Sequence, residues 1–408
     1  MLAAALFGLS LMTVVAPTNS MFKPVDQYRN GNTLCGIDVL EKDGFKELKG
    51  KTVGLITNQT GLTRDGRRNI DAMVAAGVQL KALFAPEHGF FGLEDRGGLE
   101  DLVDKTTGIK VFSLYGQTNR PTPEMLRGLD ILVFDIADVG VRFYTYETTM
   151  AYGMEGAAKA GIEYMVLDRP NPITGVQVEG PLLDTDNTSL AGYHPGTPAR
   201  HGMTMGELAR YFNAERKIGA KLNVIKMQDW RRSDWFDSTG LSWVNPSPNM
   251  RSLKAAILYP GVCLIEFAPN ISVGRGTDSP FEQFGSDFIN GREVTDFLNR
   301  RNLPGLRFYA TSFQPTESRF KDKLIQGVRI EITDRGKVES VRTGIEIACA
   351  IEKLFPKKVD WKRSERLIGS DDTVRRILAG ESAETIMSSL VKPLEEFKKI
   401  RQKYLLYK

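Results

Sequence analysis

Residues 129–167 set the architecture of this chain and read LDILVFDIADVGVRFYTYETTMAYGMEGAAKAGIEYMVL. The apolar runs at 129–136 and 163–167 are typical of buried strands. Between them, Glu147–Ala160 carries apolar residues at helical spacing and ends before Gly161, a residue that readily adopts the left-handed backbone of a helix end. The stretch therefore predicts a strand, a helix and a second strand, the repeating unit of a parallel sheet.

The same alternation extends in both directions from this stretch. Thr204 and Glu207 have the spacing of a capping box, so a further helix is expected to begin there. Leu222–Met227 predicts an added edge strand. The strands expected in one sheet are Lys51–Thr57, Leu80–Ala85, Ile109–Leu114, Leu129–Ile136 and Glu163–Leu167.

A segment rich in Pro and Trp, 230–248, interrupts this alternation and predicts a domain boundary. A length of 408 residues also exceeds the usual size of a single core. We expect an α/β domain with a parallel sheet over 36–244 and a smaller α+β domain over 245–408. In the second domain, the predicted strands are Val262–Phe267, Leu306–Tyr309 and Val328–Thr333, and the predicted helices are Arg292–Arg301, Val338–Phe355 and Leu394–Tyr407.

The amino terminus has the features of an export signal. Leu2–Ala16 is apolar and uncharged, too short to span a bilayer comfortably, and ends in the small residues Val14-Val15-Ala16 near a plausible cleavage point. We expect a signal peptide over 1–20 and a linker over 21–35, with an N-terminal core helix as the alternative. The expected location is the periplasm or the medium, without stable membrane insertion after removal of the signal.

Composition excludes several classes of protein. The chain has 54 basic and 50 acidic residues and a formal charge of +4, too mild for a nucleic-acid-binding protein. Its cysteines are Cys35, Cys263 and Cys349, which are widely separated and predict buried free thiols rather than a disulfide scaffold, although one pair could form.

No cofactor or metal motif is present. The sequence lacks the GxGxxG turn of dinucleotide-binding domains, a phosphate-binding Walker loop and the GxSxG motif of serine hydrolases. Its histidines, His88, His194 and His201, are not spaced as metal ligands. We therefore expect a reaction catalysed by the carboxyl groups of Asp or Glu side chains.

Polar residues follow the predicted strands, where a parallel sheet forms its ligand crevice. Glu87 lies between Pro86, which stiffens the chain, and Gly89, which permits close backbone approach. A carboxyl in such a turn can be shielded from water, which keeps it protonated and able to act as a general acid. Pairing with Arg96 is the structural alternative.

Asp138 follows a neighbouring strand and is a second candidate carboxylate, because glycoside cleavage commonly uses two. A helix N-cap is its alternative role. Three arginines stand beside glycine, proline or aromatic residues, and their guanidinium groups suit bidentate binding of a ligand carboxylate, with structural ion pairs as the alternative. These are Arg142, Arg251 and Arg275.

Long motifs occur at 36–38 (GID), 57–61 (TNQTG), 86–89 (PEHG), 138–146 (DVGVRFYTY), 167–172 (LDRPNP), 200–204 (RHGMT), 245–249 (NPSPN), 259–261 (YPG), 274–277 (GRGT) and 404–407 (YLLY). In these motifs the chain resembles the exo-β-N-acetylmuramidase family of glycoside hydrolases. The resemblance implies a Rossmann-like N-terminal domain, a smaller C-terminal domain and a cleft between them. It also implies release of N-acetylmuramic acid from the non-reducing ends of peptidoglycan fragments.

The resemblance places the family's conserved Glu at Glu87, with Asp138 as the second catalytic candidate. One arginine would recognise the lactyl carboxylate of muramic acid, and aromatic residues, Trp243 among them, would stack on sugar faces or line the core. The residues expected to bind substrate are Asn58, His88, Arg142, Tyr144, Tyr146, His201, Asn249, Arg251 and Arg275.

One position departs from the family pattern: Ala137 stands where a glutamine is expected before Asp138. Loss of that amide would favour a second class of function, a non-catalytic protein that binds cell-wall sugars. A third class, an amidase or another metal-dependent wall hydrolase, predicts sensitivity to chelators.

Overall fold

The computed structural model describes residues 31–184 and 192–408. The expected signal peptide, 1–20, lies outside the described residues, as does most of the expected linker. The described end of that linker, 31–35, is already part of the domain, because Leu34 bridges Gln228 and Cys35 is the N-cap of helix α1 (Gly36–Lys42). All three cysteines are free thiols, as expected; Cys35 and Cys263 are buried, whereas Cys349 is partly exposed.

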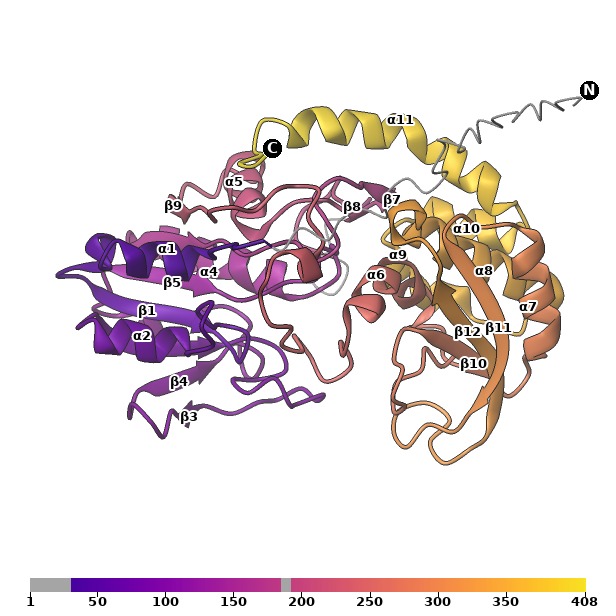
Figure 1. The fold of residues 1–408 in the computed structure, drawn as a ribbon, viewed down its shortest axis with the longest axis horizontal. Coiled ribbons are helices and arrows are strands. Elements are labelled where there is room, and N and C mark those ends of the chain that lie inside the picture. Colours follow the sequence, from indigo (N-terminus) through magenta and orange to yellow (C-terminus); the bar gives the residue numbers. More distant parts are fainter. Residues whose placement is uncertain (1–30, 185–191) are drawn as a thin grey trace, which may run out of the picture.

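A seven-stranded sheet forms the centre of the N-terminal domain, with strand order β3-β4-β2-β1-β5-β6-β9 (Figure 1). All neighbouring strands pair in parallel except β3, which runs antiparallel to β4 at one edge. The strands are β1 (Thr52–Thr57), β2 (Gln79–Ala85), β3 (Leu102–Val103), β4 (Lys110–Ser113), β5 (Ile131–Asp135), β6 (Glu163–Leu167) and β9 (Lys221–Ile225). The five predicted strands and the added edge strand are confirmed.

Both faces of the sheet are buried because its central strands are apolar at consecutive positions. In β1, Leu55 faces one hydrophobic core and Ile56 faces the other, and Leu132 and Val133 of β5 divide in the same way. One face is covered by α1 and α2 (Asn69–Ala75). The other is covered by α3 (Pro123–Leu126), α4 (Tyr146–Ala160) and α5 (Met205–Glu215).

The local signals for these helices are confirmed. Gly161 ends α4 in a left-handed conformation with φ 72°, and Thr204 and Glu207 form the capping box of α5. The chain order places β2 and β4 on one side of β1, and β5, β6 and β9 on the other. The order of the strands therefore reverses between β1 and β5, and a ligand crevice is expected at their carboxyl ends.

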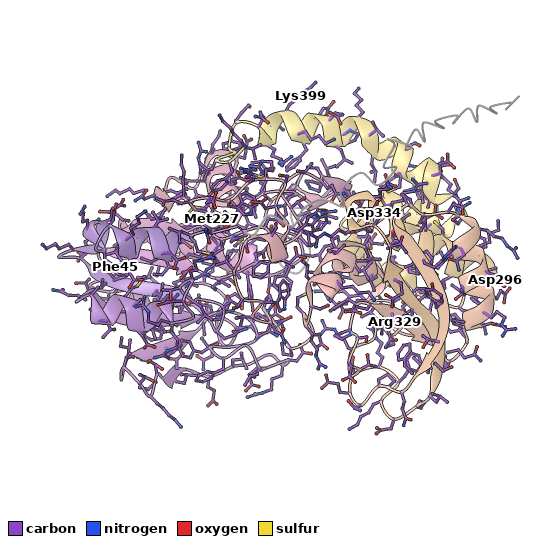
Figure 2. The ribbon with its side chains drawn as sticks, viewed as in Figure 1. Phe45, Met227, Asp296, Arg329, Asp334 and Lys399 are labelled. Atoms are coloured by element: carbon purple, nitrogen blue, oxygen red, sulfur yellow. The ribbon has the colours of Figure 1, made fainter. Side chains whose placement is uncertain are left out.

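The C-terminal domain packs helices against a three-stranded antiparallel sheet of order β10-β12-β11; Arg329 of β12 is labelled in Figure 2. Its strands are β10 (Gln283–Ser286), β11 (Leu306–Phe313) and β12 (Ile325–Ile332). Its helices are α6 (Leu253–Val262), α7 (Gly291–Arg300), α8 (Ser340–Leu354), α9 (Glu365–Ile368), α10 (Asp371–Leu378) and α11 (Ala383–Arg401). A two-stranded sheet, β7 (Glu179–Leu182) and β8 (Pro198–Arg200), lies near the junction. Short 3₁₀ helices are η1 (Lys46–Leu48), η2 (Phe236–Ser238), η3 (Cys263–Ile265), η4 (Arg335–Lys337) and η5 (Trp361–Ser364).

One prediction in this domain is wrong, and another has the right type of element with different bounds. The predicted strand 262–267 is the end of α6 continued by η3, because a short run that is apolar apart from Glu266 is compatible with a buried helix as well as a strand. The predicted helix 394–407 belongs to α11, which begins eleven residues earlier, where Ser382 caps it, and ends at Arg401. Pro393 lies inside that helix without ending it.

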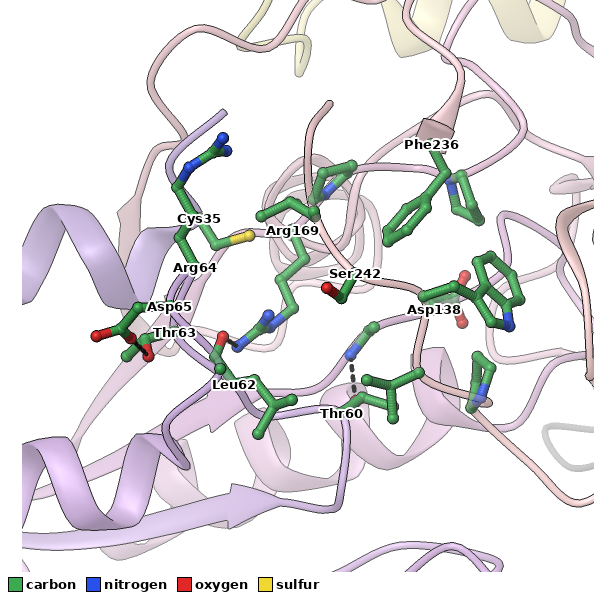
Figure 3. Close-up of a pocket in the computed structure, with 18 residues that line it drawn as sticks. Cys35, Thr60, Leu62, Thr63, Arg64, Asp65, Asp138, Arg169, Phe236 and Ser242 are labelled. Carbon is green, nitrogen blue, oxygen red and sulfur yellow. Dashed lines mark hydrogen bonds between the residues drawn. The ribbon is translucent and has the colours of Figure 1, made fainter. Parts of the chain in front are cut away.

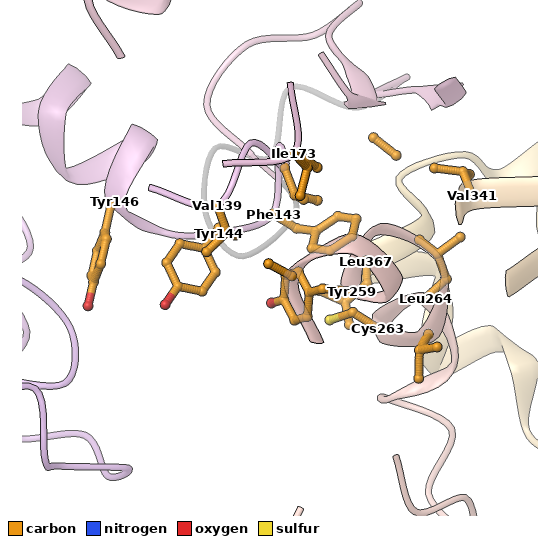
Figure 4. Packing of buried hydrophobic residues seen from close by; sticks show 14 of the residues in the cluster. Val139, Phe143, Tyr144, Tyr146, Ile173, Tyr259, Cys263, Leu264, Val341 and Leu367 are labelled. Atoms are coloured by element: carbon orange, nitrogen blue, oxygen red, sulfur yellow. The ribbon is translucent and has the colours of Figure 1, made fainter. Parts of the chain in front are cut away.

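The two domains share a continuous apolar core. Figure 4 follows it from Tyr146 and Tyr144 of the N-terminal domain to Tyr259, Cys263 and Leu367 of the C-terminal domain. Helix α11 then runs back over the N-terminal domain, and the Tyr407 hydroxyl beyond it donates to Asp168 at the end of β6 at 2.6 Å (Figure 1). Within the described residues, no helix has both the length and the apolar composition needed to cross a membrane.

Candidate active site between the domains

A pocket of about 120 Å³, which we call the inter-domain pocket, lies where the carboxyl edge of the sheet faces the C-terminal domain. Of the residues predicted from the sequence, it brings together Glu87, His88, Tyr144 and Arg275. The rest of its lining is Asp95, Phe143, Thr145, Ser247 and Met250 on one side and Tyr259, Cys263, Glu266, Phe267, Phe281 and Leu367 on the other.

Glu87 reaches the pocket from the turn that follows β2. Its Oε2 accepts a hydrogen bond of 2.5 Å from the Thr145 hydroxyl. The Tyr115 hydroxyl also interacts with Glu87, and burial together with this carboxylate raises the pKa of Tyr115. The alternative expected from the sequence is absent, because Arg96 pairs with Glu94 at 2.9 Å. Glu87 is thus held by hydroxyl groups, and no Lys, Arg or His side chain among the described residues forms an ion pair with it.

The turn itself is conformationally demanding. His88 has a φ of 67° and Gly89 a φ of 75°, both in the left-handed region. A non-glycine residue held in this region costs free energy and marks a local geometry that the surroundings enforce. Here the Gly89 amide donates to the Pro86 carbonyl at 3.0 Å, and His88 Nδ1 lies 2.7 Å from the Glu94 carbonyl. The turn thereby fixes the direction in which Glu87 leaves the sheet.

Arg275 enters from the C-terminal domain between two carboxylates. Its Nη1 donates to Asp95 at 3.1 Å and its Nε donates to Glu266 at 2.5 Å. Burial opposes its charge, but Glu266 and Asp95 outweigh that effect and raise the pKa of Arg275 above its ordinary value. The pocket therefore holds a permanent cation in a largely acidic setting.

Sequence reasoning missed Asp95 and Glu266, the additional carboxylates of this pocket. Asp95 lies in an irregular loop after β2, and Glu266 lies just after η3, in the segment wrongly predicted as a strand. Neither residue stands in a recognisable motif, so only their meeting at Arg275 reveals them. Tyr115 and Thr145 were missed as partners of Glu87, although Tyr115 follows β4 at a strand end, where polar groups are expected.

Asp138 lies in a different pocket from Glu87. A second pocket, of about 150 Å³, lies at the carboxyl ends of β1, β5 and β6, and we call it the sheet-edge pocket (Figure 3). Asp138 lines it together with Ala137 and is only 8% exposed. Its Oδ2 accepts from the Gly140 amide at 2.7 Å. Burial raises the pKa of Asp138 to about 7. The expected pairing of Asp138 with Glu87 in one pocket is therefore not what the structure shows.

The remaining candidates lie outside the lining of the inter-domain pocket. Arg142 is fully buried and donates to the Leu367 and Ile368 carbonyls at 3.3 and 2.9 Å, so it ties the domains together. Burial lowers the pKa of Arg142 to about 10. His201 is also fully buried, and burial, aided by neighbouring arginines, lowers the pKa of His201 to about 3.

The other four candidates make structural contacts. The Asn58 side chain accepts from the Thr60 amide at 2.9 Å. The Tyr146 hydroxyl donates to the Pro246 carbonyl at 2.6 Å. Asn249 donates at 3.1 Å to Asp95, a residue that lines the inter-domain pocket. Arg251 donates to the Pro248 and Thr277 carbonyls. Residues 31–184 and 192–408 contain no cluster of three His, Cys, Asp or Glu side chains arranged to hold a metal ion.

The raised pKa of Asp138 predicts a pH-dependent effect on stability. A carboxyl that binds its proton more tightly in the folded state contributes stability below its ordinary pKa, near 3.8, and loses it as the pH rises through about 7. Asp138→Asn cannot ionise, so its free energy of unfolding relative to the parent should increase between pH 4 and pH 8. A tenfold change in proton affinity corresponds to about 1.36 kcal/mol, so we expect a gain of at least about 1 kcal/mol. Denaturant unfolding at the two pH values measures it, and a pH-independent difference would contradict it.

Comparison with known proteins identifies the family. The model of the N-terminal domain of the exo-β-N-acetylmuramidase NamZ matches residues 53–254, and the model of its C-terminal domain matches residues 257–407. The chain belongs to the NamZ family. It is 44% identical to the peptidoglycan β-N-acetylmuramidase NamZ of Bacillus subtilis (strain 168), over 99% of each chain. The resemblance inferred from the motifs is therefore confirmed.

Two solved structures share the fold of this NamZ family member. Both are DUF1343 family proteins of Bacteroides fragilis NCTC 9343. One is 35% identical with a TM-score of 0.86, and the match covers 92% of this chain and 99% of that one. The other is 30% identical with a TM-score of 0.76, and the match covers 93% of this chain and 99% of that one. The expected α/β domain with a smaller α+β domain is thus the architecture of known relatives.

Proposed function

We propose that this chain is an exo-acting β-N-acetylmuramidase that hydrolyses the glycosidic bond of a terminal N-acetylmuramic acid in peptidoglycan fragments. The observation that carries the proposal is the placement of Glu87 in the inter-domain pocket, opposite Arg275 and its two carboxylates. The name of the Bacillus subtilis relative, a peptidoglycan β-N-acetylmuramidase, supports the choice of bond.

In this proposal Glu87 acts as the general acid. Thr145 donates to Oε2 of Glu87 and orients the carboxyl that would supply the proton to the glycosidic oxygen. Protonation makes the leaving sugar a neutral alcohol, which is the main requirement for breaking the bond. Asp95 and Glu266 are the carboxylates available for the second role, since Asp138 lies in the sheet-edge pocket.

Arg275 is the proposed specificity residue because it is the only one of the three predicted arginines that lines this pocket. Its Nε and Nη1 are bound by Glu266 and Asp95, while the carboxylate of Asp95 is partly exposed and can yield to a ligand. The lactyl carboxylate distinguishes N-acetylmuramic acid from N-acetylglucosamine. An arginine fork recognises such a group by paired hydrogen bonds.

The test is to compare 4-nitrophenyl β-glycosides of N-acetylmuramic acid and N-acetylglucosamine. We expect kcat/KM to be at least about tenfold higher for the muraminide, because an unpaired buried charged hydrogen bond costs on the order of 1 to 3 kcal/mol. Chelator should leave the rates unchanged, whereas a metal-dependent amidase would lose activity. Equal rates on the two glycosides, or no hydrolysis by the folded protein, would refute the proposal.

Arg275→Gln should reduce this preference by about tenfold or more, mainly through loss of the muraminide reaction. Arg96→Gln is the matched control, because Arg96 is exposed and pairs with Glu94 away from the pocket.

The non-catalytic alternative has no support in the inter-domain pocket, since Ala137 lines the sheet-edge pocket instead. We also propose export from the cytoplasm, because peptidoglycan lies outside the inner membrane; fractionation of the host cells tests it.

A further inference from the structure

The sheet-edge pocket contains an unexplained polar group. Asp138 is 8% exposed, its Oδ2 is bound by the Gly140 amide, and its Oδ1 has no hydrogen-bond partner. Buried polar atoms are almost always paired in folded proteins, so an unpaired carboxylate oxygen at the wall of a 150 Å³ cavity indicates a missing donor. Figure 3 shows Asp138 beside Ser242 and Phe236, on the opposite side of the pocket from Cys35 and Arg64.

No cation in the pocket supplies this donor. Arg169 lines the pocket but is bound by Asp135, with contacts of 2.6 and 2.9 Å. Arg64 also lines it, but donates to the carbonyls of Thr33 and Thr239. Because the arginines are already engaged and the free Asp138 oxygen can accept, or donate when it carries a proton, the pocket suits a ligand with hydroxyl or amide groups rather than an anion.

An aromatic surface stands next to this acceptor. Trp243 is half-buried and lines the pocket, and its ring meets that of Phe236 edge to face at 5.2 Å. Its indole Nε1 is already bound to Asn245. The indole therefore contributes its ring rather than its N–H, and Pro170 and Pro172 add further apolar wall. An apolar face combined with a carboxylate acceptor complements a sugar ring, which has C–H groups on its faces and hydroxyl groups at its rim.

The two pockets share their walls. The loop after β5 contributes Asp138 to the sheet-edge pocket and Tyr144 to the inter-domain pocket. Likewise, Pro246 lines the first pocket and the next residue, Ser247, lines the second. Consecutive Cα atoms are about 3.8 Å apart, so the two pockets adjoin along this segment. A ligand in the sheet-edge pocket thus lies next to the site of the proposed reaction.

We propose that the sheet-edge pocket binds one neutral hexose ring, with Asp138 accepting hydrogen bonds from its hydroxyl or amide groups and Trp243 packing on its apolar face. Two sources provide such a ring. It is either the sugar that follows the bond cleaved in the inter-domain pocket, or a free sugar. Only the first source rests on the proposed function, because it requires a substrate in the inter-domain pocket.

The binding experiment uses free N-acetylglucosamine as the probe and calorimetric titration of the full chain. We expect saturable binding that Trp243→Ala weakens at least about tenfold. Ala137→Leu, which fills the same pocket without removing a contact, should weaken it similarly. Arg275→Gln should leave binding unchanged, which separates this site from the inter-domain pocket. Tyr309→Ala is the matched control, because Tyr309 is an exposed aromatic residue of β11 that lines neither pocket.

The kinetic experiment distinguishes the two sources. If the ring is the leaving sugar, Trp243→Ala lowers kcat/KM for the disaccharide N-acetylmuramyl-N-acetylglucosamine more than for the nitrophenyl muraminide. Equal effects on both substrates assign the pocket to a free sugar. Absence of saturable binding, or binding unchanged in both Trp243→Ala and Ala137→Leu, overturns the proposal. Binding without hydrolysis of either substrate would refute the proposed function and leave this site standing.

Discussion

Glu87→Gln is expected to lower kcat/KM for the natural disaccharide by about 10² to 10⁴, the usual contribution of a general acid. Glutamine is nearly isosteric with glutamate, so the hydrogen bond from Thr145 and the fold should persist while the transferable proton is lost. Substrates with a nitrophenol leaving group need less protonation and should suffer a smaller loss. The measurement is kcat/KM for both substrates, with circular dichroism to verify folding.

Glu100→Gln is the matched control, because Glu100 is an exposed glutamate of the same loop region that does not line the inter-domain pocket. It should retain the parent rate on both substrates. A folded Glu87→Gln protein that cleaves the disaccharide within about threefold of the parent would show that Glu87 is not the acid.

Asp135→Ala is expected to destabilise the protein by about 3 to 5 kcal/mol, the usual cost of removing one partner of a buried ion pair. The Asp135 carboxylate is fully buried and accepts from Arg169 at 2.6 and 2.9 Å and from Asn69 at 2.8 Å. Its removal leaves the Arg169 charge buried without a counter-ion at the junction of β5, β6 and α2. Denaturant unfolding at neutral pH measures the loss.

Glu163→Ala is the control for this effect. Glu163 pairs with Lys51 at 2.7 Å at the other end of the same sheet, but both side chains are partly exposed. Exposed ion pairs contribute about 0 to 1 kcal/mol, so this variant should unfold close to the parent. Comparable losses for both variants would mean that burial does not determine the energetic role of the Asp135 pair.

The parallel sheet was predictable because its signals are local. The apolar runs of β1 and β5, the stop at Gly161 and the capping box at Thr204 each depend on a few adjacent residues. The strand predicted over 262–267 is wrong, because these six residues, apolar apart from Glu266, have no periodicity that separates a buried strand from a buried helix. Its surroundings in three dimensions, the packing of α6 and η3 against α8, decide the outcome.

The residues of the candidate site were predictable where they directly follow a strand of the parallel sheet. Glu87 follows a central strand, so it reaches the carboxyl edge of the sheet. Asp95 and Glu266 reach the same pocket from irregular segments far apart in the sequence, and no local pattern marks them. Conversely, Arg142 and His201 lie in uncommon motifs but are fully buried and do not line the inter-domain pocket, because unusual sequence reflects demanding packing as well as chemistry.

The carboxyl-terminal tail constrains the order in which the protein can be completed. Beyond α11, the Leu406 amide donates to Glu207, the Tyr407 hydroxyl donates to Asp168, and the Lys408 carbonyl accepts from the Arg232 amide. These partners belong to the N-terminal domain, which is synthesised first. The groups of that domain that bind Leu406, Tyr407 and Lys408 therefore stay unfilled until these residues fold against it. An affinity tag joined to Lys408 would add bulk at this closing step, and a tag for purification belongs elsewhere.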